Sequence, residues 1–408
     1  MSILEKISFI TGGIVLRACA YVAFTNNIAY SDHIVLQTML IRRYESIIMI
    51  REEVFRFNLG VSSMSGPLVP YMTQFFSLLI SVFDWIAEAF PSSRLSHDNG
   101  LFVVSVLVDV FGFLWLHQRF HRSGRSMWNT AIWCWFNPIM ICACALSPIP
   151  SIELFLLASV SALIEQQSAC AVPSFILLLF AYPTYIVLCP ALWALWNYNT
   201  ISKAGKTQCN YMATPYFCFI IAITAYLFKD TDPQILVQRF VFFANPLSAF
   251  KGISYEPSLG ILWYLDAQAF QSFRHYLAIL VLSQPYLMAI PLFLKFGKTQ
   301  PRLLFDVTAV LTIMFKPALT LCDVTIGMVL LAGHTDAIAG MRYLPVLMLG
   351  ILASAALSPL TVMLWLSRGS GNANYLFFQG LALWIFASIA FVEFVRSATT
   401  IVQKPSSV

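Results

Sequence analysis

The chain has 408 residues, of which 59% are hydrophobic and 11% are charged, and its formal net charge is +5. Soluble domains average about 45–50% apolar and about 25% charged residues, so this composition excludes an ordinary soluble fold. The basic residues stand between or within apolar runs, which argues against nucleic-acid binding. Because the apolar runs are continuous and lack the period of two of a β-barrel, we expect an all-α polytopic membrane protein.

The first apolar segment is predicted over residues 8–24. Ala18-Cys19-Ala20 is similar to a signal-peptidase cleavage box, so a cleaved signal peptide is the alternative. Arg17 interrupts the apolar region just before that box, and the apolar character continues beyond it. This pattern favours an uncleaved first span with its N-terminus in the cytosol.

Residues 25–99 are expected to form a luminal region with two membrane-associated helices. The stretch 41–57 has apolar positions at helical spacing and charges on the other face, which predicts an amphipathic helix in the interface plane. The basic stretch 117–125 should be a cytosolic loop. If the N-terminus is also cytosolic, only one further span, 101–116, fits between the first span and this loop, so we expect the apolar run 67–90 to dip into the membrane rather than cross it.

The rest of the chain is dominated by long apolar runs, which bring the expected total to about 10 to 12 passes. We interpret residues 1–408 as a single polytopic domain in which the polar stretch 228–260 is an interfacial connection. Three prolines predict that the run 171–196 is kinked or split. The predicted spans after the first are 101–116, 128–147, 150–166, 171–196, 212–227, 274–296, 303–332, 343–366 and 372–396.

The run 303–332 carries three ionisable residues, Asp306, Lys316 and Asp323. Each costs about 2.5 to 3.5 kcal/mol at membrane depth, so such groups usually face protein or a cavity. Pro317 directly follows Lys316 and predicts a broken or kinked helix. We expect a polar joint in which Lys316 pairs with Asp323 or with Asp306. The alternative is a turn at the membrane surface with Lys316 reaching the headgroups.

Three further polar residues are predicted to be buried. Asp109 lies in the middle of the predicted 101–116 span and needs a partner there. Arg17 should pair inside the helix bundle, and Asp109 is a candidate for its partner. Asn137-Pro138 is interpreted as a device that kinks the chain rather than as a binding site.

The sequence offers no recognisable catalytic set: it has no HExxH, Walker or GxSxG motif. His117 and His121 have the i, i+4 spacing of metal ligands but no third ligand, so a solvated basic edge is favoured over a metal site. We expect neither a metal nor a cofactor. The acids that a sugar transferase would need in its first luminal loop do not form a pair and are interpreted as an amphipathic surface; they are Asp32, Glu45, Glu52 and Glu53.

Several stretches in a fixed order together resemble one family. They are Arg17, Leu59-Gly60-Val61-Ser62 with Ser65-Gly66, Asp109, Phe136-Asn137-Pro138, Tyr182-Pro183, Leu259-Gly260-Ile261-Leu262-Trp263-Tyr264 with Phe270, Phe315-Lys316 with Asp323, and Gly371-Asn372-Ala373-Asn374-Tyr375. This set resembles the U subunit of glycosylphosphatidylinositol (GPI) transamidase (PIG-U, phosphatidylinositol-glycan class U), a multi-pass protein of the endoplasmic reticulum. The resemblance covers nearly the whole chain.

The resemblance implies a role rather than a reaction. The family is similar in architecture to membrane (GT-C-like) glycosyltransferases but lacks their catalytic acids. In the complex, a separate caspase-like cysteine protease subunit cleaves the C-terminal signal of a proprotein, and the U subunit helps to bind or present the GPI lipid. The implied partners are therefore the other transamidase subunits and the GPI lipid. The alternative is an active GT-C-type lipid-linked mannosyltransferase of GPI assembly, and a transporter is a third hypothesis because of the broken helix.

A binder of GPI needs an apolar groove with a few polar groups at its rim. The candidate lipid-binding or structural residues are Asn372, Asn374, Lys316, Asp323, Trp263 and Tyr264. Asn372 and Asn374 open the last span, where backbone donors favour a phosphate; the alternative is an ordinary helix cap. Leu265, Asp266 and Gln268 stand where the family carries two phenylalanines and a glutamate, so we expect a divergent member.

Overall fold

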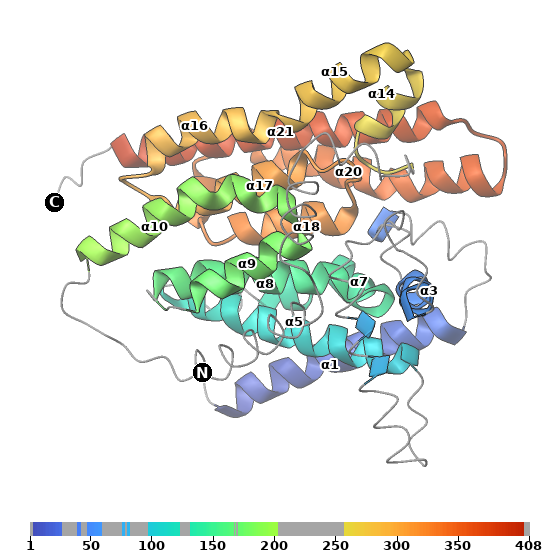
Figure 1. Cartoon of the computed structure of the whole chain (residues 1–408), viewed down its shortest axis with the longest axis horizontal. Coiled ribbons are helices and arrows are strands. Elements are labelled where there is room, and N and C mark those ends of the chain that lie inside the picture. Colours follow the sequence, from blue (N-terminus) through green and yellow to red (C-terminus); the bar gives the residue numbers. More distant parts are fainter. Residues whose placement is uncertain are drawn as a thin grey trace. The chain divides into compact units, whose positions relative to one another are not determined.

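A computed structural model of the chain describes residues 3–26, 39–41, 47–58, 76–77, 80–81, 97–122, 131–166, 168, 170–202 and 257–403. Within these ranges every regular element is a helix, which confirms the all-α class (Figure 1). The Leu59–Gly66 motif, the 212–227 span, nearly all of 67–90 and most of 228–260 lie outside the described residues. The chain divides into two compact units, Met1–Asn27 with Arg43–Ser254 and Ile28–Arg42 with Tyr255–Val408. The single domain over 1–408 stays a prediction.

Unit 1 is built around the mostly apolar helix α8 (Ile149–Glu165), which packs against α5 and α9 (Figure 1). Every residue of α8 except Phe155 is buried. A helix without a broad polar face belongs in a core, because it has little to offer water. The other described elements of unit 1 are α1 (Ile3–Asn26), α3 (Ile47–Asn58), α5 (His97–Arg122), η3 (Ala131–Trp135), α7 (Pro138–Leu146), α9 (Ala171–Ala181), η4 (Pro183–Leu188) and α10 (Cys189–Ser202).

Two expectations for unit 1 differ from the structure. The stretch 117–125 was expected as a loop, but α5 continues to Arg122, and Arg119 is buried. The runs 128–147 and 150–166 were expected as two spans. Instead α7 and α8 form a pair bent by 118°. The helix α7 has nine residues, which at about 1.5 Å each are too few to cross a bilayer.

The prediction that 171–196 is split is confirmed. The helix α9 ends at Ala181, the 3-10 helix η4 begins at Pro183, and α10 begins at Cys189. Proline lacks a backbone donor and clashes with the preceding turn, so it ends α9 and starts the next element.

In unit 2, α20 (Leu344–Val362) and α21 (Ala373–Gln403) lie side by side (Figure 1). They approach closely because α20 carries a glycine at the contact: a Cβ on Gly350 would lie 2.5 Å from the ring of Phe386. The other described elements of unit 2 are α14 (Leu262–Gln268), α15 (Gln271–Leu282), α16 (Gln284–Phe296), α17 (Pro301–Met314), α18 (Leu321–Leu331), α19 (Thr335–Ala339) and η5 (Met363–Ser367).

The described residues include four helices long and apolar enough to cross a membrane, and the bent α7–α8 pair makes up to five. The four are Asn99–His121, Ser272–Phe296, Leu344–Ser367 and Ala373–Ile401. The protein is therefore a multi-pass membrane protein. The expected total of about 10 to 12 passes includes segments that lie outside the described residues, so that total stays a prediction.

Candidate functional site

The break predicted at Lys316-Pro317 is confirmed: α17 ends at Met314 and α18 begins at Leu321. Across the break, the Lys316 ammonium donates to Asp323 Oδ1 at 2.6 Å. Both side chains are 5% exposed, which rules out a lysine that reaches the membrane surface. Asp306, the other candidate partner, contacts His334 Nε2 through its Oδ2 at 2.7 Å. We call Lys316, Thr320 and Asp323 the joint.

Within the joint, Asp323 also caps α18. Its Oδ2 accepts hydrogen bonds from the Thr320 backbone N and from Thr320 Oγ1, both at 2.9 Å, while Asp323 N donates to Thr320 Oγ1 at 3.2 Å. This reciprocal capping box satisfies donors that would otherwise be exposed at the start of the helix. One oxygen of the carboxylate thus pairs with the buried Lys316, and the other oxygen caps α18. Both oxygens therefore have a structural role.

A second cluster joins α14, η5 and the start of α21. The Tyr264 hydroxyl donates to Asn374 Oδ1, and its ring stacks on Phe377 with 4.2 Å between centroids. Trp263 stacks on Trp365 with 6.0 Å between centroids. We call these five residues the rim. Asn374 is exposed while Trp263 is buried, so the rim presents a polar group over aromatic rings.

Asn372 belongs to the start of α21 and precedes its first residue. Its Oδ1 accepts a hydrogen bond from Asn374 N at 3.0 Å. This is the bond of a helix cap, in which a side chain satisfies a donor of the first turn. Asn372 and Asn374 are both exposed, and binding of a phosphate by this helix start stays a prediction.

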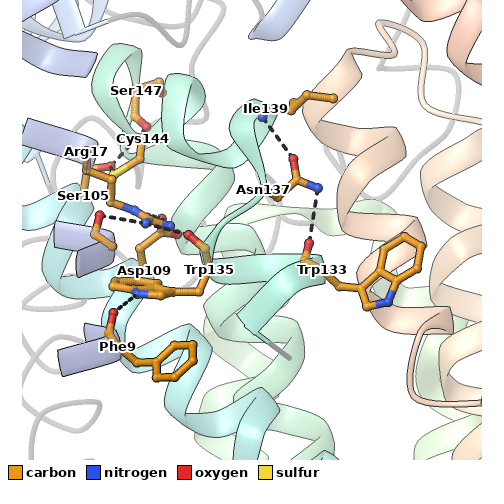
Figure 2. A network of polar contacts seen from close by, with 11 residues as sticks. Phe9, Arg17, Ser105, Asp109, Trp133, Trp135, Asn137, Ile139, Cys144 and Ser147 are labelled. Carbon is orange, nitrogen blue, oxygen red and sulfur yellow. Dashed lines mark hydrogen bonds and ion pairs between the residues drawn. The ribbon is translucent and has the colours of Figure 1, made fainter. Parts of the chain in front are cut away.

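In unit 1, Arg17 and Asp109 form the expected pair (Figure 2). Arg17 Nε and Nη2 lie 2.8 and 2.7 Å from Asp109 Oδ2. Arg17 Nη1 donates to the carbonyls of Gly13 and Trp135 at 3.2 and 3.0 Å. The guanidinium also lies 3.9 Å from the centroid of the Trp135 ring. The arginine is thereby bound by α1, α5 and η3 at once.

Asn137 lies at the edge of the same network (Figure 2). Its Oδ1 accepts from Ile139 N at 3.0 Å and its Nδ2 donates to Trp133 O at 3.3 Å, so it caps α7 and ties it to the π-helical turn before it. This agrees with a role in bending the chain. Asn137 is half-buried rather than buried, which corrects the expectation, because a cap lies at a helix end rather than along its packed face.

Three buried polar contacts were missed in the sequence. Arg119 Nε lies 3.4 Å from Glu165 Oε1, the Tyr185 hydroxyl donates to Glu153, and Asp306 contacts His334. The two glutamates were a signal, since each stands in an apolar run where an acid needs a partner. The partners could not be named, because they are far away in the sequence.

The expected residues fall in two different units of the chain. The joint and the rim belong to unit 2, whereas Arg17, Asp109 and Asn137 belong to unit 1. Among the described residues no group of three His, Cys, Asp or Glu side chains is placed to hold a metal ion. The rim is the part in which exposed polar groups and aromatic rings meet beside apolar helices, so it is the candidate binding site.

A family model described as GPI transamidase subunit PIG-U matches residues 15–383. The chain belongs to the PIG-U family. The match includes the joint and the rim, and it confirms the resemblance that the ordered motifs indicated. Membership makes the chain one of a family of GPI transamidase subunits.

A curated relative of this PIG-U family member is the "GPI transamidase component GAB1 homolog" of Schizosaccharomyces pombe. The two are 24% identical over 148 residues, which is 35% of this chain and 34% of the relative. The chain thus matches about a third of the length of that relative. The low identity agrees with the divergent membership expected from Leu265, Asp266 and Gln268.

Proposed function

We propose that this protein is the non-catalytic U subunit of GPI transamidase in the endoplasmic reticulum membrane, where it binds or presents the GPI lipid donor. The other subunits of the complex, including a caspase-like cysteine protease, would be its partners, and the protease would carry out the covalent chemistry. Family membership supports the complex, and the rim supports the lipid role.

The observation that carries the lipid role is the set of side chains at the start of α21, which are the rim and its neighbour Asn372. Asn372 and Asn374 are exposed at the N-terminus of a 31-residue helix, where backbone donors and the helix dipole favour an anion such as the inositol phosphate. The half-buried Tyr264 adds a flat surface with a polar edge, which suits sugars at a membrane interface, and the buried Trp263 packs behind it. The neighbouring apolar faces of α20 and α21 would accommodate the alkyl chains.

The charge distribution in unit 2 supports a luminal position for the rim. Figure 1 shows α14 and the α20–α21 connection at one end of this unit and the end of α21 at the other. Basic residues in short connections favour the cytosolic side. Among the described residues, the end opposite the rim carries Lys295, Lys298, Arg302, Arg342 and Arg396, whereas the rim end carries Arg274 and Arg368.

Depletion of the protein tests the role in the complex. We expect complete GPI lipid and uncleaved proproteins to accumulate together, because the donor would be made but not transferred. Metabolic labelling of GPI lipids and immunoblotting of a reporter proprotein measure both. Accumulation of mannose-deficient GPI precursors would instead support the mannosyltransferase alternative, and normal anchoring would defeat the proposal.

Variants of the rim test the lipid role. Asn374→Ala and Tyr264→Phe should weaken binding of the full chain to nanodiscs containing phosphatidylinositol. Each variant removes the hydrogen bond between these two side chains, which holds the polar groups of the rim in place. A neutral hydrogen bond contributes about 0.5–1.5 kcal/mol net, so its loss corresponds to at most roughly tenfold in affinity. Tyr276→Phe is the matched control, since Tyr276 is 71% exposed on α15 and lies outside the rim. Equal binding by all three variants would remove the lipid role from the rim.

A further inference from the structure

Ser258–Gly260, which we call the connector, runs directly into α14 and is buried. Leu259 is 0% exposed and Ser258 is 5% exposed. The Leu259 backbone N donates to Leu319 O at 3.1 Å. Leu319 lies in the break between α17 and α18, where backbone carbonyls lack the partners that a continuous helix would supply. The connector therefore satisfies a polar group that the break sets free.

On one side, the connector lies against the backbone of the break between α17 and α18. A Cβ on Gly260 would lie 2.8 Å from Pro317 O and 3.3 Å from Leu319 N. Neither of these backbone atoms can rotate away as a side chain would. Gly260 is thus the residue type that permits the contact, because it has no Cβ.

On the opposite side, the connector is in contact with α21. A Cβ on Gly380 would lie 2.7 Å from Leu259 O and 3.3 Å from Leu259 C. The connector therefore lies between the backbone of the break and the backbone of α21, and a glycine permits the close approach at each contact. A change in either contact must move the connector or the element behind it.

Both halves of the rim are attached at this point. Trp263 and Tyr264 follow the connector in the chain, and Trp263 Nε1 donates to Ser258 O at 2.8 Å. Asn374 and Phe377 precede Gly380 by six and three residues on the same continuous helix. The contact between Leu259 and Gly380 therefore sets the distance between Tyr264 and its partners Asn374 and Phe377.

We propose that Gly260 and Gly380 are positioning residues of the rim, which hold its two halves in register through the connector. The proposal rests on the proposed lipid role of the rim, and it adds the residues that regulate its geometry. Neither glycine belongs to the rim, so their effect on a ligand would be indirect.

Gly260→Ala and Gly380→Ala in the full-length protein test the proposal. Gly327→Ala is the matched control in the same unit, because a Cβ there would lie 3.7 Å from Val310, an ordinary contact. The geometry of the rim is measured first, as the yield of a short thiol-to-thiol crosslinker in a Tyr264→Cys, Phe377→Cys background. Binding to phosphatidylinositol nanodiscs is measured second, in proteins with native rim residues. The thermal midpoint of each protein is measured in parallel.

We expect both alanine variants to lower the crosslinking yield and to weaken phosphatidylinositol binding about tenfold, while Gly327→Ala changes neither. Unchanged crosslinking in the two alanine variants would overturn the proposal. It would also be overturned if these variants reduced crosslinking but bound phosphatidylinositol as tightly as the native protein, while Asn374→Ala weakened binding. If rim variants do not affect binding, the lipid role fails, and the crosslinking yield alone decides whether the glycines position the rim. If both alanine variants fail to fold, Trp263→Phe replaces them. It removes the bond to Ser258 O that ties α14 to the connector, and it also reduces the stacking on Trp365. Unchanged crosslinking there would likewise overturn the proposal.

Discussion

At the scale of residues, buried charges in this protein are bound to several elements at once. Arg17 contacts Asp109 on α5, Gly13 on its own helix and Trp135 on η3. A buried ion pair gains little net stability from its charges, because both must leave water. The pair instead contributes to structural specificity, because the guanidinium has all its partners only when α1, α5 and η3 are packed in this way.

Removing one member of the pair should therefore cost far more than removing both. Asp109→Leu leaves the Arg17 charge buried without its carboxylate, and we expect a loss of about 3–5 kcal/mol in the free energy of unfolding. The double variant Arg17→Met with Asp109→Leu should recover part of this loss. Thermal unfolding of the detergent-solubilised protein measures both. A double variant that is as unstable as the sum of the single ones would contradict the interpretation.

At the joint, the stability that comes from the charge of Asp323 can be separated from the stability that comes from its helix cap. Asp323→Asn weakens the interaction with Lys316 but keeps an oxygen that can accept from the Thr320 backbone N, whereas Asp323→Ala removes both. Helix caps contribute about 0.5–2 kcal/mol, so Asp323→Ala should be less stable than Asp323→Asn by about 1 kcal/mol. The same unfolding measurement checks the order. Equal stability of the two variants would show that capping by Asp323 contributes nothing measurable.

At the scale of elements, close approach of α20 to α21 depends on Gly350. Glycine has no Cβ and so leaves room for the Phe386 ring; a Cβ at position 350 would lie 2.5 Å from the ring atom Cδ1. Gly350→Ala should lower stability by about 1–3 kcal/mol through overpacking. Phe386→Leu in the same chain should relieve the clash, and the pair should therefore be coupled by more than about 0.5 kcal/mol in a double-mutant cycle. Additive effects would mean that the two residues do not share this contact.

Much of this element structure could be predicted from local signals. Pro317 with two acids nearby indicated the break at the joint, and three prolines indicated the divided run 171–196. The apolar runs near the C-terminus became α20 and α21. These predictions succeeded because proline and membrane-length apolar runs act through neighbouring residues alone.

The errors came from tertiary contacts. The stretch after Leu116 reads as a basic loop, but Arg119 finds Glu165 on α8, and this buried pair allows α5 to continue. The rim likewise depends on Trp365, which is far from Trp263 in the sequence and gave no signal of its own. Such partners follow from how helices pack, and one sequence does not encode them in a local pattern.

At the scale of the whole molecule, the basic end of unit 2 gives a testable orientation. In sealed microsomes, a membrane-impermeant maleimide should label Lys298→Cys, which we expect on the cytosolic side, and should not label Ser370→Cys, which lies beside the rim. Detergent should expose Ser370→Cys. The unmodified protein supplies the background from its native cysteines. The reverse labelling pattern would place the rim in the cytosol and remove it from contact with a luminal donor.

The enclosure of α8 also constrains how the chain is assembled during synthesis. Bilayer lipid has almost no contact with this helix in the finished protein, since 16 of its 17 residues are covered by neighbours. The helix α5 precedes it in the chain, but α9 and α10 are made later. The partner of Glu165, Arg119 on α5, is made before α8, whereas the partner of Glu153, Tyr185 on η4, is made after it. Mutations that delay the segments after α8 should therefore leave Glu153 without the Tyr185 hydroxyl and expose α8 to membrane quality control.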